Sequence, residues 1–95
     1  MLCKITAKKK TPEKIFYGTD TGFTHLIRPA LYGSHHNIYN LTPNDLPKEK
    51  VTICGNICEC TDNLGESIEI SGEIGDILMI ENAGAYGFSM SSNYN

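Results

Sequence analysis

Residues 66–80 read Glu-Ser-Ile-Glu-Ile-Ser-Gly-Glu-Ile-Gly-Asp-Ile-Leu-Met-Ile, and this stretch decides the fold class. In Glu66–Ile70 charged or polar side chains alternate with isoleucines, which is the period of a half-buried strand. Gly72–Asp76 contains two glycines and an aspartate, which is the composition of a turn. Ile77–Ile80 is apolar throughout and predicts a buried strand. A strand, a short turn and a second strand in immediate succession indicate a β protein.

The same signals recur toward the start of the chain. Leu2–Lys8 alternates apolar and polar residues, and Lys14–Asp20 is rich in aromatic and β-branched residues, so the two are predicted to form a hairpin. Lys9–Glu13, with its proline and charges, is the predicted turn. Two further short strands are predicted at Asn37–Asn40 and Val51–Gly55. Five or six short strands with a turn signal about every ten residues predict an all-β fold, a partial sandwich or barrel.

Two further predictions concern a helical turn and the completeness of the domain. Phe23–Arg28 is predicted to form one helical turn that Pro29 stops, because the residue before a proline avoids helical geometry. The 95 residues make one domain at most. No strand follows the loop after Ile77–Ile80, so we expect an incomplete β-domain, residues 1–95, whose last strand lacks a neighbour and exposes an edge.

Composition excludes several classes of partner. The net charge of −3 argues against a nucleic-acid-binding protein, and the basic Lys8–Lys10 is interpreted as part of a solvated turn. No apolar run approaches the roughly 20 residues of a membrane-spanning helix, and the first residues do not resemble a signal peptide. We therefore expect a cytoplasmic protein that binds neither nucleic acid nor membrane.

The cysteines do not form a recognisable metal motif. Cys54, Cys58 and Cys60 are separated by three residues and then by one, without a CxxC pair. His35 and His36 are adjacent, so both cannot face one metal from a regular strand. We expect no metal site and reduced thiols, as in a cytosolic protein.

Candidate site residues begin in the segment that follows the last strand, Asn82–Asn95. Gly84 and Gly87 flank Tyr86, so the backbone can turn there and a ligand can approach the main chain. A run of serine, asparagine and tyrosine follows, with short hydrogen-bonding side chains and no charge. This composition is typical of a loop that lines a site. The alternative is a glycine-rich turn without a function.

Two other stretches carry chemistry. In Asp20–Tyr32, Arg28 offers a planar fork that can hold a carboxylate by two parallel hydrogen bonds, and Tyr32 lies four positions further on. The alternative is a surface ion pair and a packed tyrosine. In the loop after Val51–Gly55, Cys58 could serve as an acid and Glu59 as an amine-binding carboxylate. The alternative is a small buried thiol and a solvated charge.

These three stretches resemble, in order and spacing, the diaminopimelate decarboxylases. Members of that family use pyridoxal phosphate to remove one carboxylate from meso-diaminopimelate and so make lysine. The resemblance implies that Arg28 and Tyr32 bind substrate, with the arginine on a carboxylate, and that Tyr86 contacts cofactor and substrate. It implies that Cys58 is catalytic and lies at the cofactor, and that Glu59 binds the amino group at the substrate's far end, both in the partner subunit's active site.

The resemblance also implies what surrounds this chain. It would be the C-terminal β-domain of a homodimeric decarboxylase, and the lysine that holds pyridoxal phosphate would lie in a preceding barrel of strands and helices. The chain alone is then expected to be inactive. Two alternatives are a decarboxylase of the same fold acting on ornithine, arginine or carboxynorspermidine, and a β-domain remnant that acts as an interaction module. Arg28 argues against the simple diamine precursors, because they have no second carboxylate to grip.

Overall fold

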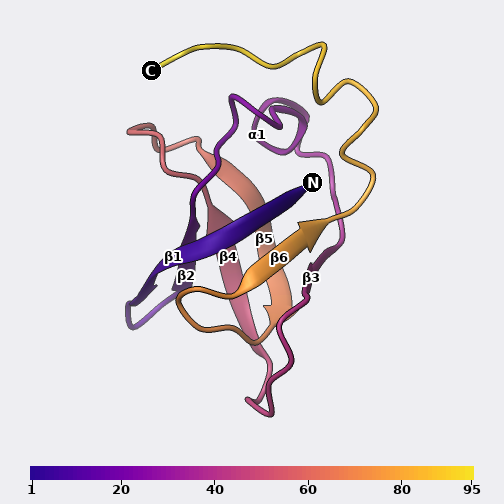
Figure 1. The fold of residues 1–95 in the computed structure, drawn as a ribbon. Helices are drawn as coiled ribbons and strands as arrows, with labels where there is room; N and C mark the ends of the chain where they lie inside the picture. Colours follow the sequence, from indigo (N-terminus) through magenta and orange to yellow (C-terminus); the bar gives the residue numbers. More distant parts are fainter.

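The computed structural model describes all residues, 1–95, and its strands form a single sheet that curls into a nearly closed barrel (Figure 1). The all-β prediction is confirmed, and of its two forms the barrel is the one observed. The strands and the one short helix are β1 (Leu2–Lys10), β2 (Ile15–Thr19), α1 (Arg28–Tyr32), β3 (Ile38–Asn40), β4 (Glu49–Cys54), β5 (Asn63–Ile70) and β6 (Ile77–Ile80).

The order of strands in the sheet is β3-β6-β1-β2-β4-β5. All neighbours run antiparallel except β2 and β4, which are parallel. The first and last strands of the chain are therefore adjacent in the centre of the sheet. Met1 and Ile80 exchange two backbone hydrogen bonds there, of 2.9 and 2.8 Å, which extend the β1–β6 ladder to the first residue.

Side chains close the gap between the two edge strands, β3 and β5. The side chain of Ile38 packs over Gly65, where an added Cβ would lie only 3.1 Å from Ile38 Cδ1. Asn40 Nδ2 donates a 2.8 Å hydrogen bond to the carbonyl of Ser71, just beyond the end of β5. The edges thus meet without a backbone ladder, and neither strand presents a wholly free flank to solvent.

The barrel interior is a single apolar cluster, because alternate residues of each strand point inward. Ile5, Ile53, Leu64 and Leu78 are completely buried. The twelve members are Cys3, Ile5, Tyr17, Leu26, Ile38, Val51, Ile53, Leu64, Ile68, Ile70, Leu78 and Ile80.

The short helix differs from the sequence prediction. Phe23–His25 forms a turn, and the helix begins at Arg28 with Pro29 in its first turn. Proline was expected to end a helix here, but at the first helical positions its missing N–H group has no intrahelical partner to lose, and its fixed φ favours the helix. The prediction was wrong because the position of the proline within the helix decides its effect.

The last strand also differs from expectation, because β6 pairs with β1 on one side and β3 on the other. No edge is exposed there. Strand limits shift as well: β1 continues to Lys10, and β5 begins at Asn63, where an irregular connection was expected. Lys8 lies in β1 rather than in a solvated turn, and its Nζ donates to the carbonyl of Gly72 at 2.7 Å. No helix has the length and apolar character needed to cross a membrane.

Because the thiol of Cys3 is buried, the barrel is expected to lose stability at alkaline pH. Burial, together with the nearby Asp20 carboxylate, raises the pKa of Cys3 from 9.0 to about 11. The neutral thiol is therefore favoured by folding, and this contribution is present below pH 9 and is lost as the pH rises through 11. We expect the free energy of unfolding to fall by about 2–3 kcal/mol from Cys3 alone across that window, measured by urea denaturation.

Cys3→Ala is the control for this prediction, because it removes the thiol and with it that part of the pH dependence. A second buried group, Tyr17, has its pKa raised by burial and contributes a slope of the same sign in both proteins. Equal slopes for the wild type and Cys3→Ala would contradict the prediction.

Candidate functional site

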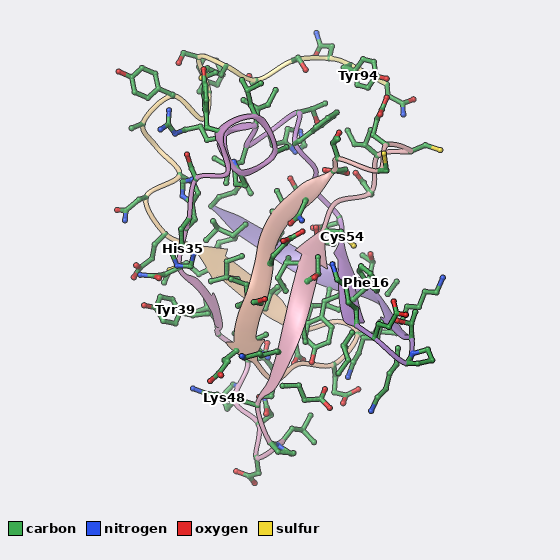
Figure 2. All side chains as sticks on the ribbon, turned by 180° about the vertical axis from the view of Figure 1, so that it is seen from behind. Phe16, His35, Tyr39, Lys48, Cys54 and Tyr94 are labelled. Atoms are coloured by element: carbon green, nitrogen blue, oxygen red, sulfur yellow. The ribbon has the colours of Figure 1, made fainter.

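Three segments gather at one end of the barrel: α1, the loop between β4 and β5, and the C-terminal segment after β6 (Figure 1). These segments carry all the candidate site residues. Lys48 marks the opposite end of the molecule in Figure 2, whereas Tyr94 lies at the end where the candidates gather. The loops at this end form the surface on which a site can be built.

The ends of α1 are defined by local chemistry. The backbone N–H of Gly33 donates to the carbonyl of Pro29 at 3.0 Å, and Gly33 adopts a left-handed conformation with φ of 66°. Glycine takes up that conformation without the steric cost of a Cβ, so it ends the helix after a little more than one turn. Arg28 and Tyr32 are consequently the first and last residues of one helical turn and lie on the same side of it.

Arg28 lies against two tyrosine rings. Its Cζ atom is 5.3 Å from the centroid of the Tyr32 ring and 5.5 Å from that of Tyr86. Both distances fit cation–π contacts, and the guanidinium N–H groups donate no hydrogen bond within the chain. No carboxylate pairs with Arg28 in the chain, since the one ion pair joins Lys8 and Glu73. The guanidinium is thus oriented but has no anionic partner.

The backbone of the loop after β6 delivers Tyr86 to this position. Tyr86 is itself in the left-handed region with φ of 62°, a conformation that costs a non-glycine residue roughly 1–2 kcal/mol. Gly87 follows because a Cβ there would lie 2.1 Å from the carbonyl oxygen of Ala83. Gly84 has open space around it, so of these two glycines only Gly87 lies where a side chain would obstruct the turn.

A buried histidine joins the end of α1 to the end of β6. Nδ1 of His36 lies 2.9 Å from the carbonyl oxygen of Glu81, so that nitrogen carries the proton and donates. The backbone N–H of Glu81 donates to the carbonyl of Asn37 at 2.9 Å. These bonds fix the distance between the helix that carries Arg28 and the loop that carries Tyr86.

The second group of candidates, Cys58 and Glu59, lies in the exposed loop between β4 and β5. The side chain of Glu59 accepts a hydrogen bond from the phenol of Tyr94 in the C-terminal segment. That bond raises the pKa of Tyr94, because a neighbouring carboxylate disfavours the phenolate. Next to Cys58 is an open hollow of about 460 Å³, which Tyr94 also lines.

Asp62 holds the loop that bears Cys58 and Glu59. Its carboxylate is 4% exposed; Oδ1 accepts a 2.7 Å hydrogen bond from the N–H of Phe23, and Oδ2 accepts one of 2.8 Å from Ile57. Gly55 leaves room for it, since a Cβ there would lie 2.2 Å from Oδ2. Burial and this carboxylate together raise the pKa of the nearby Cys54 thiol. One side chain thus links the turn before α1 to the Cys58 loop.

The structure brings Arg28, Tyr32 and Tyr86 into one cluster. No hydrogen bond or ring contact joins that cluster to Cys58 or Glu59, which form a second group at the same end of the barrel. Three residues have structural roles that the sequence did not predict: His36, which was weighed only as a metal ligand, Asp62 and Tyr94. Of the three, Asp62 could most readily have been found from the sequence, because it follows Cys58 and Glu59 in the same short stretch. In the structure two glycines, Gly22 and Gly55, make space for it.

A model of the C-terminal sheet domain of pyridoxal-dependent decarboxylases matches residues 1–84. The chain belongs to this family. Over its full length this sheet domain is 46% identical to the diaminopimelate decarboxylase of Methanothermobacter thermautotrophicus and 42% identical to that of Neisseria meningitidis serogroup A. It spans 22% and 23% of those two proteins, which is less than a quarter of their length.

The solved structures agree with this assignment. A crystal structure of the diaminopimelate decarboxylase of Methanocaldococcus jannaschii, in complex with L-lysine, superposes on 99% of the sheet domain with a TM-score of 0.93. The sequence identity is 40%, and the match covers 22% of that chain. The resemblance drawn from the three stretches of sequence is thereby confirmed at the level of the family and the fold.

Removal of the Asp62 carboxylate should destabilise the sheet domain strongly. Asp62→Ala leaves the partly buried N–H groups of Phe23 and Ile57 without their acceptors, so we expect the free energy of unfolding to fall by about 2–4 kcal/mol in urea denaturation. The amide protons of Phe23 and Ile57 should also exchange faster with solvent. The matched control is Asp45→Ala, since Asp45 is an exposed carboxylate and its loss should change stability by less than about 0.5 kcal/mol. Equal stability of the two variants would refute this role.

Proposed function

We propose that this sheet domain is the C-terminal part of a diaminopimelate decarboxylase, which converts meso-diaminopimelate to L-lysine and CO2. The observation that carries the proposal is Arg28, whose guanidinium is oriented by two tyrosine rings and has no carboxylate partner in the chain. The identity of 46% and 42% to the matching parts of two diaminopimelate decarboxylases supports the choice of substrate.

Arg28 would bind the carboxylate that the substrate keeps. A half-buried arginine with free N–H edges can form two parallel charge-assisted hydrogen bonds to a carboxylate, and the rings of Tyr32 and Tyr86 limit its motion. Holding that end of a long, flexible substrate fixes which end can react. Tyr32, 61% exposed, would complete the contact with its phenol.

Tyr86 would contact both the cofactor and the substrate. Its side chain is 62% exposed and its phenol forms no hydrogen bond within the chain, so the phenol is available to donate to an anionic oxygen. Pyridoxal phosphate, when bound, supplies a ring that accepts the electrons left behind as the carboxylate departs. None of the chain's lysines lies in the segments that carry the candidate residues, and the lysine that holds the cofactor would lie in the preceding barrel.

Cys58 and Glu59 would act in the active site of a partner subunit. Glu59 would accept hydrogen bonds from the ammonium at the substrate's far end. Cys58 would donate the proton of its Sγ to the substrate carbon that has lost its carboxylate, and would itself become a thiolate. Their separation from the Arg28 cluster within one chain supports roles in two different sites of a homodimer. An exposed apolar and aromatic surface at the same end supports burial against another domain or subunit; it comprises Leu31, Tyr32, Tyr86 and Phe88.

The proposal also places the reaction in the cytoplasm. All four cysteines are free thiols, which fits the reducing cytoplasm. A same-fold decarboxylase that acts on ornithine remains the main competing assignment for the substrate. Arg28 disfavours it, because ornithine has only the carboxylate that is lost and would leave the guanidinium without a partner.

Reconstitution tests the reaction and the substrate together. The sheet domain is mixed with the matching barrel domain and pyridoxal phosphate, and CO2 release is measured from meso-diaminopimelate and, separately, from ornithine. We expect turnover of meso-diaminopimelate by the mixture only, with neither part active alone. A functional assembly that prefers ornithine would contradict the substrate assignment, and an assembled, cofactor-loaded complex that releases no CO2 would favour the interaction-module alternative.

The same assembly tests Arg28. Arg28→Lys keeps the charge but loses the planar fork, so we expect kcat/KM for meso-diaminopimelate to fall about 100-fold, the size of an effect expected when charge-assisted hydrogen bonds are lost. Lys14→Ala, which removes an exposed charge at the β1–β2 turn, should leave kcat/KM unchanged. Equal values of kcat/KM for Arg28→Lys and the wild type would contradict the role of Arg28 in substrate binding.

A further inference from the structure

The C-terminal segment folds back over the loop that carries Glu59. The backbone N–H of Ser92 donates to the carbonyl of Thr24 at 3.0 Å, which fixes the path of the segment across the turn before α1. The ring of Tyr94 then packs edge-to-face on Phe23, with centroids 5.9 Å apart and an interplanar angle of 62°. These two contacts place the phenol of Tyr94 on the side chain of Glu59.

The hydrogen bond from Tyr94 reaches only one of the two oxygens of Glu59, Oε1. The other oxygen accepts no hydrogen bond within the chain and is available to a donor. Glutamate is a long side chain, and in an exposed loop it loses considerable rotamer freedom whenever it binds a ligand. A phenol that already binds one oxygen restricts the side chain beforehand, so the side chain loses less rotamer freedom when the ligand binds. Both partners face the end of the barrel where the candidate residues gather.

We propose that Tyr94 is a positioning residue, which holds Glu59 in the orientation that receives the ammonium at the far end of the substrate. This inference rests on the proposed function, because it takes Glu59 as the ammonium-binding carboxylate. Tyr94 acts through Glu59 and does not itself take part in bond breaking. Phe23 supports this arrangement by packing against the ring of Tyr94. The backbone N–H of Phe23 in turn donates a hydrogen bond to the carboxylate of Asp62, which holds Phe23 in place.

The arrangement also explains a feature of the sequence. The run Ser91-Ser92-Asn93-Tyr94 is polar and exposed, so packing alone does not require an aromatic residue at its end. Tyr94 is 54% exposed and contributes little to the core. What the position supplies is a hydroxyl at the tip of a rigid side chain, within reach of a loop 35 residues earlier.

Tyr94→Phe in the assembled decarboxylase tests the proposal, because it removes the hydroxyl and keeps the ring that packs on Phe23. We expect KM for meso-diaminopimelate to rise about five- to tenfold while kcat changes less than about twofold, since the lost interaction serves binding rather than the bond-breaking step. Tyr39→Phe is the matched control: Tyr39 is an exposed tyrosine on β3, outside the site, and its change should leave both constants unaltered.

A double-mutant cycle separates positioning from a general structural effect. If Tyr94 acts through Glu59, adding Tyr94→Phe to Glu59→Gln should change KM by less than twofold, far below its effect in the wild type. An undiminished effect in the Glu59→Gln background would overturn the proposal, and so would an active enzyme whose KM is insensitive to Tyr94→Phe. An assembly that does not decarboxylate meso-diaminopimelate would overturn the proposed function, and this inference with it.

The contact can be measured apart from the reaction, by NMR titration of the tyrosine ring carbons in the 95-residue chain. The hydrogen bond to Glu59 raises the pKa of Tyr94, so Glu59→Gln should lower that pKa toward the ordinary value of tyrosine. The resonance is assigned by its absence in Tyr94→Phe. An identical Tyr94 titration with and without Glu59 would show that the two side chains do not interact, and would overturn the proposal whatever the kinetics.

Discussion

The buried carboxylate of Asp62 is the interaction on which the functional end of the barrel depends. It accepts hydrogen bonds from two backbone N–H groups that belong to segments about 35 residues apart in sequence, at Phe23 and Ile57. A charge is tolerated in such a place only when it is well hydrogen-bonded. Gly22 and Gly55 surround it because any side chain there would occupy the space of the carboxylate. The turn before α1 and the loop that bears Cys58 and Glu59 are therefore held in one fixed relation.

The barrel itself contributes rigidity rather than chemistry. Its interior is apolar and carries no candidate residue, whereas every candidate lies in a segment that leaves the sheet at one end. The segments are fastened to each other by polar contacts: His36 to Glu81, Asp62 to Phe23 and Ile57, and Tyr94 to Glu59. Substitutions in these contacts would change the geometry of the site without removing a side chain from the barrel core.

Sequence reasoning recovered the strands because alternation and apolar runs are local signals, as in Glu66–Ile70 and Ile77–Ile80. It assigned roles to Arg28, Tyr32 and Tyr86 through the resemblance to a known family, since the residues alone left a surface ion pair, a packed tyrosine and a plain turn as alternatives. The structure brings these three together. It misplaced the helix because proline favours a first turn and opposes a later one, and only the fold decides which turn is which. It also left β6 without a neighbour, since pairing with β1 depends on contacts across almost the whole chain. Asp62 and Tyr94 were missed for the same reason: their partners, Phe23 and Glu59, are distant in sequence.

The pairing of β1 with β6 has a consequence for how this domain folds. Leu2 lies opposite Met79, so the centre of the sheet is completed by residues about 77 positions apart in sequence. Such a contact carries the entropic cost of closing a long loop, and proteins dominated by distant pairings reach the native state slowly. The β1–β2 hairpin and the β4–β5 pair are local and can form early. During synthesis on the ribosome the barrel cannot close until β6 has left the exit tunnel, and until then the inner faces of β1 and β2 are open to solvent and to chaperones.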